Sequence, residues 1–113
     1  MEDRGQQHSL FLVRIYFNED NLYKERPLSD YLLNEVEKSG LSGATVFRGI
    51  MGFGVHHHVH TTSLLRLTES LPLILEIMDT EQKLLELLQK LKPALNECTI
   101  IKIPVESINL DFL

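Results

Sequence analysis

The sequence contains few of the residues on which disulfide-bonded, cysteine-ligated or membrane-spanning proteins depend. It has no tryptophan and a single cysteine, Cys98, which excludes an internal disulfide and a cysteine-rich metal site. Its apolar runs are far shorter than the ~20 residues that cross a bilayer, so we expect no direct insertion into a membrane. The net charge of −5 argues against general nucleic-acid binding, because such binding depends on clustered Lys and Arg that neutralise phosphates. These absences favour a cytoplasmic protein without nucleic acid among its partners.

The residues that are present favour one folded domain. With 113 residues, of which 43% are hydrophobic and 24% charged, the chain can bury a core of ordinary size. Residues 1–9 are polar, and we expect them to form a disordered leader to a single domain at residues 10–113.

Hydrophobic periodicity predicts four strands and two helices. The expected strands are Leu10–Phe17, Ala44–Ile50, Leu73–Met78 and Cys98–Val105, and Asn18–Glu25 is expected to be a loop. The first helix should begin near Pro27, bury Leu28, Leu32 and Val36, and end at Gly40. The second should be capped by Asp79 or Thr80, carry a stripe of Leu84, Leu87, Leu88 and Leu91, and end before Pro93. This β-α-β-β-α-β order predicts an α+β ferredoxin-like sandwich, with a four-stranded antiparallel sheet and two helices on one face.

The sheet face without helices is predicted to be unusually apolar. If it met water it should be polar. Opposite the fully apolar strand faces lie three sets, each with one charge: Leu12-Arg14-Tyr16, Ile74-Glu76-Met78 and Ile100-Lys102-Pro104. The usual strand order of this fold brings Arg14 beside Glu76. The pattern favours an oligomer interface with paired charges, and the alternative is a solvated face with scattered apolar residues.

The segment RGIMGFGVHHHVH, residues 48–60, is the strongest candidate for a binding site. Gly49, Gly52 and Gly54 lie within six residues, so successive backbone N–H groups can form an anion-binding nest. Alternatively, these glycines relieve strain where a strand bends into a loop. Arg48 is the nearest fixed cation, and it either contacts the anion or pairs with a carboxylate.

Four of the five histidines follow in the same segment. His56, His58 and His60 would point to one side of an extended strand, about 6.6–6.8 Å apart, so they could hold zinc, nickel or copper only if the segment bends. A metal site would also need ligands from neighbouring subunits. Otherwise His58 and His60 contact an anion, or the histidines belong to a solvated loop.

The stretch GATVFRGIMGFG, followed by LPLILEIMD, resembles the PII-like family called domain of unknown function 190, and the resemblance extends from Leu10 to Val105. PII proteins are ferredoxin-like trimers whose sheets face inward and whose intersubunit clefts bind adenine nucleotides. The resemblance implies that Gly52, Phe53 and Gly54 match the motif whose backbone amides meet the nucleotide. It also implies that Val55–Arg66 is the loop that reports the bound state to a partner protein.

Two departures from the PII pattern argue against a full triphosphate clamp. KPALNE, residues 92–97, replaces the second glycine- and lysine-rich loop, and the tail ESINLDFL carries no basic residue. A nucleotide with fewer phosphates, another small anion, or no nucleotide remains open.

The sequence therefore predicts a non-catalytic, trimeric ligand-sensing module that regulates a partner protein of unknown identity. Nothing in it places a nucleophile, a base and an oxyanion hole together. The expected ligand-binding residues are Arg48, Gly49, Gly52, Phe53, Gly54, His58 and His60, with an adenine nucleotide as the candidate ligand. The alternative is a trimer that binds a divalent metal through His56, His58 and His60.

Overall fold

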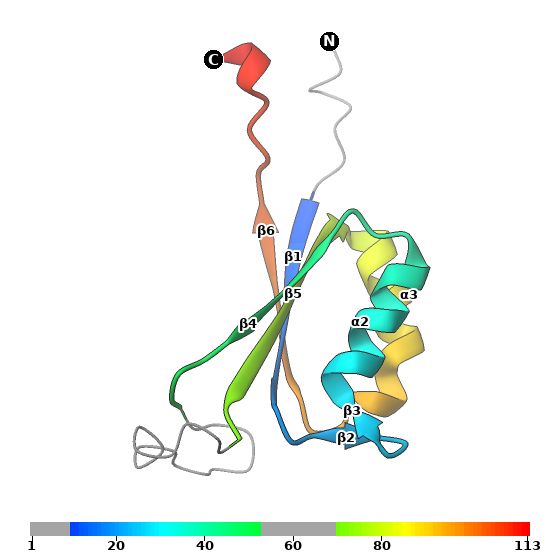
Figure 1. The fold of residues 1–113 in the computed structure, drawn as a ribbon. Helices are drawn as coiled ribbons and strands as arrows, with labels where there is room; N and C mark the ends of the chain where they lie inside the picture. Colours follow the sequence, from blue (N-terminus) through cyan, green and yellow to red (C-terminus); the bar gives the residue numbers. More distant parts are fainter. Residues whose placement is uncertain (1–9, 53–69) are drawn as a thin grey trace.

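The computed structural model describes residues 10–52 and 70–113 (Figure 1). In chain order its strands and helices are β1 (Leu10–Asn18), β2 (Leu22–Tyr23), β3 (Arg26–Pro27), α2 (Leu28–Ser39), β4 (Ala44–Arg48), β5 (Pro72–Thr80), α3 (Glu81–Leu91) and β6 (Thr99–Val105). Short 3₁₀ turns cover Lys92–Ala94 and Leu110–Phe112. The predicted leader at residues 1–9 and the predicted loop Val55–Arg66 lie outside the described residues.

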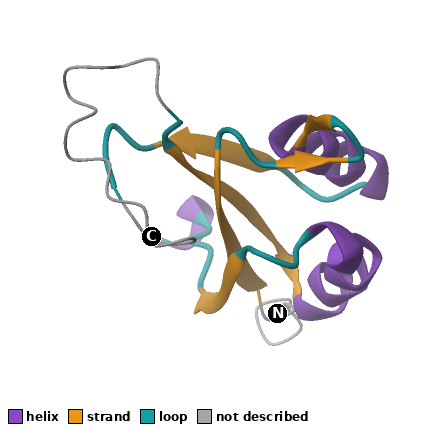
Figure 2. Cartoon of the chain, turned by 90° about the horizontal axis from the view of Figure 1, so that it is seen from below, coloured by secondary structure: helices purple, strands orange, loops and turns teal. Residues whose placement is uncertain are grey.

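The four long strands form one antiparallel sheet in the order β4-β5-β1-β6. Both helices lie on the same side of this sheet (Figure 2). The predicted α+β ferredoxin-like fold is therefore confirmed.

The core lies between the sheet and the helices, where the predicted periodicities place it. β1 contributes Val13, Ile15 and Phe17, each at most 2% exposed. The helices face them with two buried stripes, Leu28, Leu32 and Val36 from α2 and Leu84, Leu87 and Leu91 from α3. Residues spaced by three or four positions share one helix face, so each stripe meets the sheet along its length.

The helix ends follow the predicted chemistry. α2 stops at Gly40, whose φ of 78° lies in the left-handed region that glycine adopts at low cost. α3 starts at Thr80, whose side-chain oxygen accepts a hydrogen bond from the Lys83 backbone N–H at 3.4 Å. Thr80, rather than Asp79, is therefore the cap.

The prediction that Asn18–Glu25 is only a loop was wrong. Within it and just beyond, β2 and β3 pair as a short hairpin, with Leu22 opposite Pro27. The turn residues Lys24 and Glu25 have φ values of 52° and 66°. Glycine and asparagine usually occupy such positions, so the turn has no sequence signal.

The predicted facing of the last strand was also wrong. Val13 pairs with Lys102, and Ile15 with Ile100, and directly opposite residues of an antiparallel pair share a face. Ile100, Lys102 and Pro104 therefore lie on the helix side of the sheet. All three are exposed there, because the helices do not cover this edge strand. Lys102 pairs with Glu81 at the start of α3.

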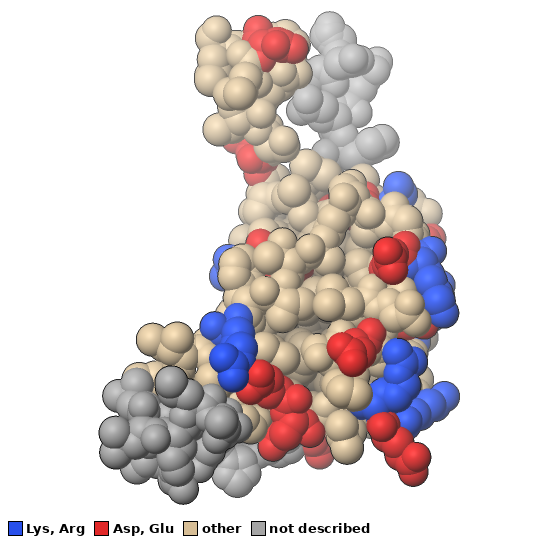
Figure 3. All heavy atoms as spheres, in the orientation of Figure 1, with Lys and Arg blue, Asp and Glu red and all other residues tan. Residues whose placement is uncertain are grey.

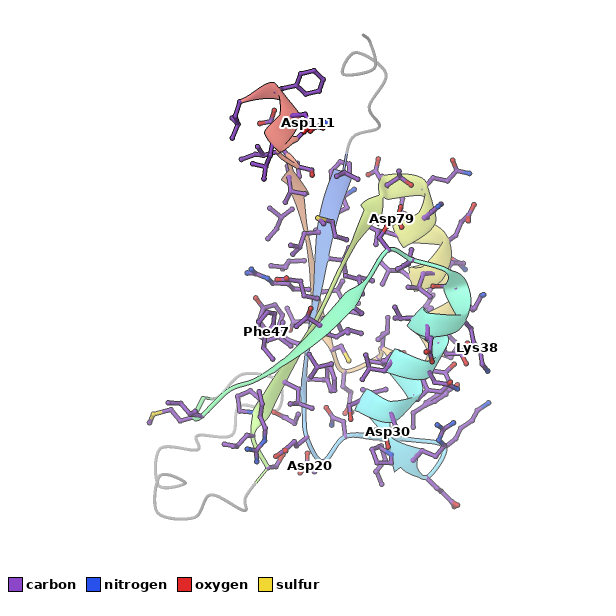
Figure 4. The ribbon with its side chains drawn as sticks, turned by 45° about the horizontal axis from the view of Figure 1, so that its top comes forward. Asp20, Asp30, Lys38, Phe47, Asp79 and Asp111 are labelled. Atoms are coloured by element: carbon purple, nitrogen blue, oxygen red, sulfur yellow. The ribbon has the colours of Figure 1, made fainter. Side chains whose placement is uncertain are left out.

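This register makes the opposite side, here called the outer face, more apolar than predicted. It places these residues there: Leu10, Leu12, Arg14 and Tyr16 of β1, Thr45 and Phe47 of β4, Ile74, Glu76 and Met78 of β5, and Thr99, Ile101, Ile103 and Val105 of β6. Phe47 points away from the helix layer (Figure 4) and is 47% exposed. In the view of Figure 3, charged side chains gather over the helices and near the lower ends of the strands, and uncharged ones cover the middle.

The predicted charge pair on the outer face is present. Arg14 and Glu76 lie opposite each other in the register, and Arg14 Nε donates a hydrogen bond to Glu76 Oε2 at 2.9 Å. This bond, followed by one with Tyr16, raises the pKa of Arg14. The two charges therefore satisfy each other within the apolar surface.

Beyond β4 the chain runs close against the start of β5. The Gly49 backbone N–H donates to the Pro72 carbonyl at 2.8 Å. A Cβ atom at Gly49 would lie 2.8 Å from Pro72 Cγ, and one at Gly52 would lie 3.3 Å from the same atom. The proline ring occupies the space that a side chain would need, which supports the structural alternative for these two glycines.

Gly49→Ala is therefore expected to lower the free energy of unfolding by about 1–3 kcal/mol, the usual cost of overpacking. Gly43→Ala is the matched control, because a Cβ there meets nothing within 4 Å and its φ needs no glycine. Urea denaturation of both variants without any ligand measures the difference. Equal stability of the two would show that Pro72 does not require glycine at position 49.

Candidate functional site

The predicted site residues divide between described and undescribed parts of the chain. Arg48 ends β4, Gly49 follows it directly, and Gly52 is the last described residue before the gap. Phe53, Gly54, His56, His58 and His60 lie outside the described residues, as do all five histidines of the chain. The described ranges 10–52 and 70–113 hold no group of three or more potential metal ligands. The metal hypothesis thus stays a prediction.

Arg48 pairs with a carboxylate, which is one of the two roles predicted for it. Its Nε donates to Glu19 Oε2 at 2.6 Å, and a terminal guanidinium nitrogen donates to Glu19 Oε1 at 3.3 Å. Glu19 Oε1 also accepts a hydrogen bond from the Leu71 backbone N–H at 3.2 Å. One carboxylate thus joins the end of β4 to the start of β5.

The electrostatics of this contact favour the charged forms. The hydrogen bond from Arg48 holds the pKa of Glu19 below its usual range. Partial burial raises this pKa, and the hydrogen bond from the Leu71 N–H lowers it. The Arg48 side chain nevertheless remains 51% exposed. The guanidinium is therefore partnered and at the same time reachable from solvent.

A hollow lies at the other end of β4, between α2 and the loop that follows it. Its volume is about 560 Å³, within the range of small-molecule sites. We call it the α2 hollow; it is lined by Asp30, Leu33, Asn34, Val36, Glu37, Leu41, Gly43 and Ala44. Leucine side chains provide apolar walls, and two carboxylates and an amide provide hydrogen-bond acceptors.

A buried carboxylate fixes the loop that forms one side of this hollow. Asp79 is 7% exposed, and its Oδ2 accepts a hydrogen bond from the Ser42 backbone N–H at 3.3 Å. Its Oδ1 accepts from the Thr80 backbone N–H at 2.7 Å. The loop between α2 and β4 is therefore tied to the end of β5, next to the start of α3.

The sequence did not reveal the α2 hollow. Asp30, Asn34 and Glu37 follow the helical spacing of four and then three residues, so they share one helix face. That spacing was the available signal, but a solvated polar face has the same spacing. The concavity itself depends on how the loop after α2 packs.

The segment at residues 92–97 has a compact structural role. Lys92–Ala94 forms a 3₁₀ turn, and the side chain of Leu95 is 7% exposed and packs in the core. The neighbouring Cys98 is half-buried, and burial raises the pKa of its thiol to about 11. A thiol of this kind is unreactive near neutral pH.

None of the described helices is both long and apolar enough to span a bilayer.

Comparison with known proteins places the chain in a family. The model of the DUF190 family, described as "Uncharacterized ACR, COG1993", matches residues 10–107. A UPF0166 protein from Aquifex aeolicus (strain VF5) is 40% identical over 81 residues, which are 72% of this chain and 77% of the relative.

Solved structures share the fold at low sequence identity. CPII from Thiomonas intermedia K12, in a structure bound to ADP, AMP and acetate, has a TM-score of 0.64 and 12% identity, and the match covers 90% of this chain and 91% of CPII. A GlnK–ATP complex from B. subtilis has a TM-score of 0.57 and 18% identity, and the match covers 91% of this chain and 90% of GlnK. The fold is thus that of the PII-like proteins, and the matched sequence shows that this chain belongs to the DUF190 family.

Proposed function

We propose that this protein is a non-catalytic PII-like signalling module that binds an adenine nucleotide with one or two phosphates between subunits of a trimer. The α2 hollow is the observation that carries this proposal. It is a recess of ligand size with apolar and polar walls at one end of β4, and the other end of β4 carries Arg48 and the glycines. The PII-like fold, and the nucleotides named for CPII and GlnK, support the same conclusion.

The chemistry of the α2 hollow suits the base of a nucleotide. Leu33 and Leu41 can contact the faces of an adenine ring, and the oxygens of Asp30, Asn34 and Glu37 can accept hydrogen bonds from its exocyclic amine. The same two carboxylates repel phosphate. The hollow therefore takes the uncharged end of the ligand and directs the phosphates away.

The phosphates would bind at the Arg48 end of β4 in a neighbouring subunit. Four residue steps separate Ala44 from Arg48, or about 13 Å along a strand, so the two ends of β4 in one chain lie far apart. A site formed by two subunits brings one end of each strand together. There the guanidinium of Arg48 and the backbone amides near Gly52, Phe53 and Gly54 meet the anion.

The outer face would form the trimer interface. It is a largely apolar surface whose charges at Arg14 and Glu76 are already paired, which is how interfaces accommodate charge at low cost. If the ligand contacts the segment Val55–Arg66 in only one of its states, ligand binding would favour that state. The surface that a regulated partner protein binds would then change.

Isothermal titration of the metal-free protein with AMP, ADP and ATP tests the proposal. We expect AMP and ADP to bind, and ATP to gain little from its third phosphate. Zinc is titrated in parallel, and zinc binding without nucleotide binding would favour the metal-binding trimer of His56, His58 and His60 instead.

Leu33→Glu should weaken ADP binding about 10-fold, because it removes an apolar wall of the hollow and adds a third carboxylate near an anionic ligand. Leu85→Glu is the matched control, since both leucines are exposed helix residues, at 39% and 49%, and Leu85 lies on α3 away from the hollow lining. Circular dichroism checks that both variants fold. Equal ADP affinity of the two variants would remove the hollow from the site.

Substitutions at two adjacent residues of β6 test the proposed trimer interface. Ile101→Glu places a carboxylate on the outer face opposite Arg14, and Ile100→Glu places one on the helix side. Ile101→Glu should convert the trimer to folded monomers, because Arg14 is already paired with Glu76 and desolvating a further charge at an interface costs several kcal/mol. Ile100→Glu should elute from a size-exclusion column as the wild type does. Dissociation by both variants, or by neither, would contradict the proposed interface.

A further inference from the structure

The carboxylate of Glu19 lies where three segments of the chain meet. Glu19 follows the end of β1. Its side chain receives two hydrogen bonds from Arg48, the last residue of β4, and a third from the Leu71 backbone N–H just before β5. The Glu19 backbone N–H also donates to the Leu71 carbonyl at 2.9 Å. We call the side-chain contacts the Glu19 bridge.

The Glu19 bridge has the geometry of a bound anion. Two guanidinium nitrogens of Arg48 donate hydrogen bonds to the two carboxylate oxygens of Glu19, and the Leu71 backbone N–H donates a third. Arginine binds the oxygens of a phosphate in the same forked arrangement. While Glu19 holds these two N–H groups, Arg48 cannot offer the same pair to a ligand phosphate.

We propose that Glu19 is an internal competitor for the anion site, and that a ligand phosphate binds Arg48 by displacing the Glu19 carboxylate and thereby frees the Leu71 amide. This inference rests on the proposed function, because it assumes that Arg48 contacts the phosphate. In this exchange Glu19 limits the affinity for the anion, and its contact with the Leu71 amide changes on binding.

The exchange is accessible because neither partner is deeply buried. The side chains of Arg48 and Glu19 are 51% and 33% exposed, and ion pairs of this exposure are weak. A phosphate with greater charge can therefore replace the carboxylate. Displacement would remove the side-chain tie between β4 and β5 and leave the backbone bond from Glu19 to Leu71 in place. The anion would thus contact Arg48 only in the state in which the Glu19 bridge is broken. A ligand can shift an equilibrium between two states only if it binds one of them more tightly.

Two variants of the full chain separate competition from a general charge effect. Glu19→Gln removes the carboxylate charge and keeps the side-chain shape. Asp20→Asn changes the net charge equally one residue further on. Among the described residues, Asp20 donates a 3.3 Å hydrogen bond from its backbone N–H to Ser70 Oγ. ADP is titrated calorimetrically into wild type and both variants, and amide exchange of Leu71 is followed by NMR with and without ADP.

We expect Glu19→Gln to bind ADP about 2- to 5-fold more tightly than wild type and Asp20→Asn to match wild type within error. The Leu71 amide of wild type should exchange faster when ADP is bound. If wild type binds ADP, but Glu19→Gln binds no more tightly than Asp20→Asn and Leu71 exchange is unchanged, the competitor role is wrong and the proposed function stands. If none of the three proteins binds ADP, the proposed function fails and the competitor role fails with it.

Discussion

The rest of the structure depends on the fact that both described helices, α2 and α3, lie on the same side of the sheet (Figure 2). β1 and β5 form the centre of the sheet, and most of their helix-side residues, such as Val13, Ile15 and Leu75, are almost completely buried. Burial of this face provides the hydrophobic driving force for the fold. The described helices do not cover the outer face, which includes Phe47, Met78 and apolar residues of β6. An apolar surface of this kind usually marks an interface in a soluble protein.

β4 connects this architecture to the proposed site. It lies at the edge of the sheet, and the structure places a different feature at each of its ends: the α2 hollow beside Ala44, and the Arg48–Glu19 pair at the other end. Asp79 holds the first end through Ser42, and Pro72 packs against Gly49 at the second. Both ends are therefore fixed to β5, so the strand can present two halves of a shared site in a defined geometry.

Some features could be predicted from sequence because local chemistry determines them. Leu28, Leu32, Val36 and Gly40 define both the buried face and the end of α2, and the strand order of the fold placed Arg14 beside Glu76. The facing of β6 could not be predicted, because Ile100 and Ile101 are both apolar and alternation alone cannot choose between them. The hairpin at Lys24 and Glu25 lacked turn residues, and the hollow arises only from tertiary packing. The pairing of Arg48 with a carboxylate was foreseen, but only the structure identified Glu19 as the partner.

The central claim is that the outer face is buried between copies of this chain. Light scattering of the wild-type protein over a wide concentration range tests it most directly. We expect a constant mass of three times the 13.0 kDa of one chain. A mass of one chain at every concentration would contradict it, because the outer face would then be stable in contact with water.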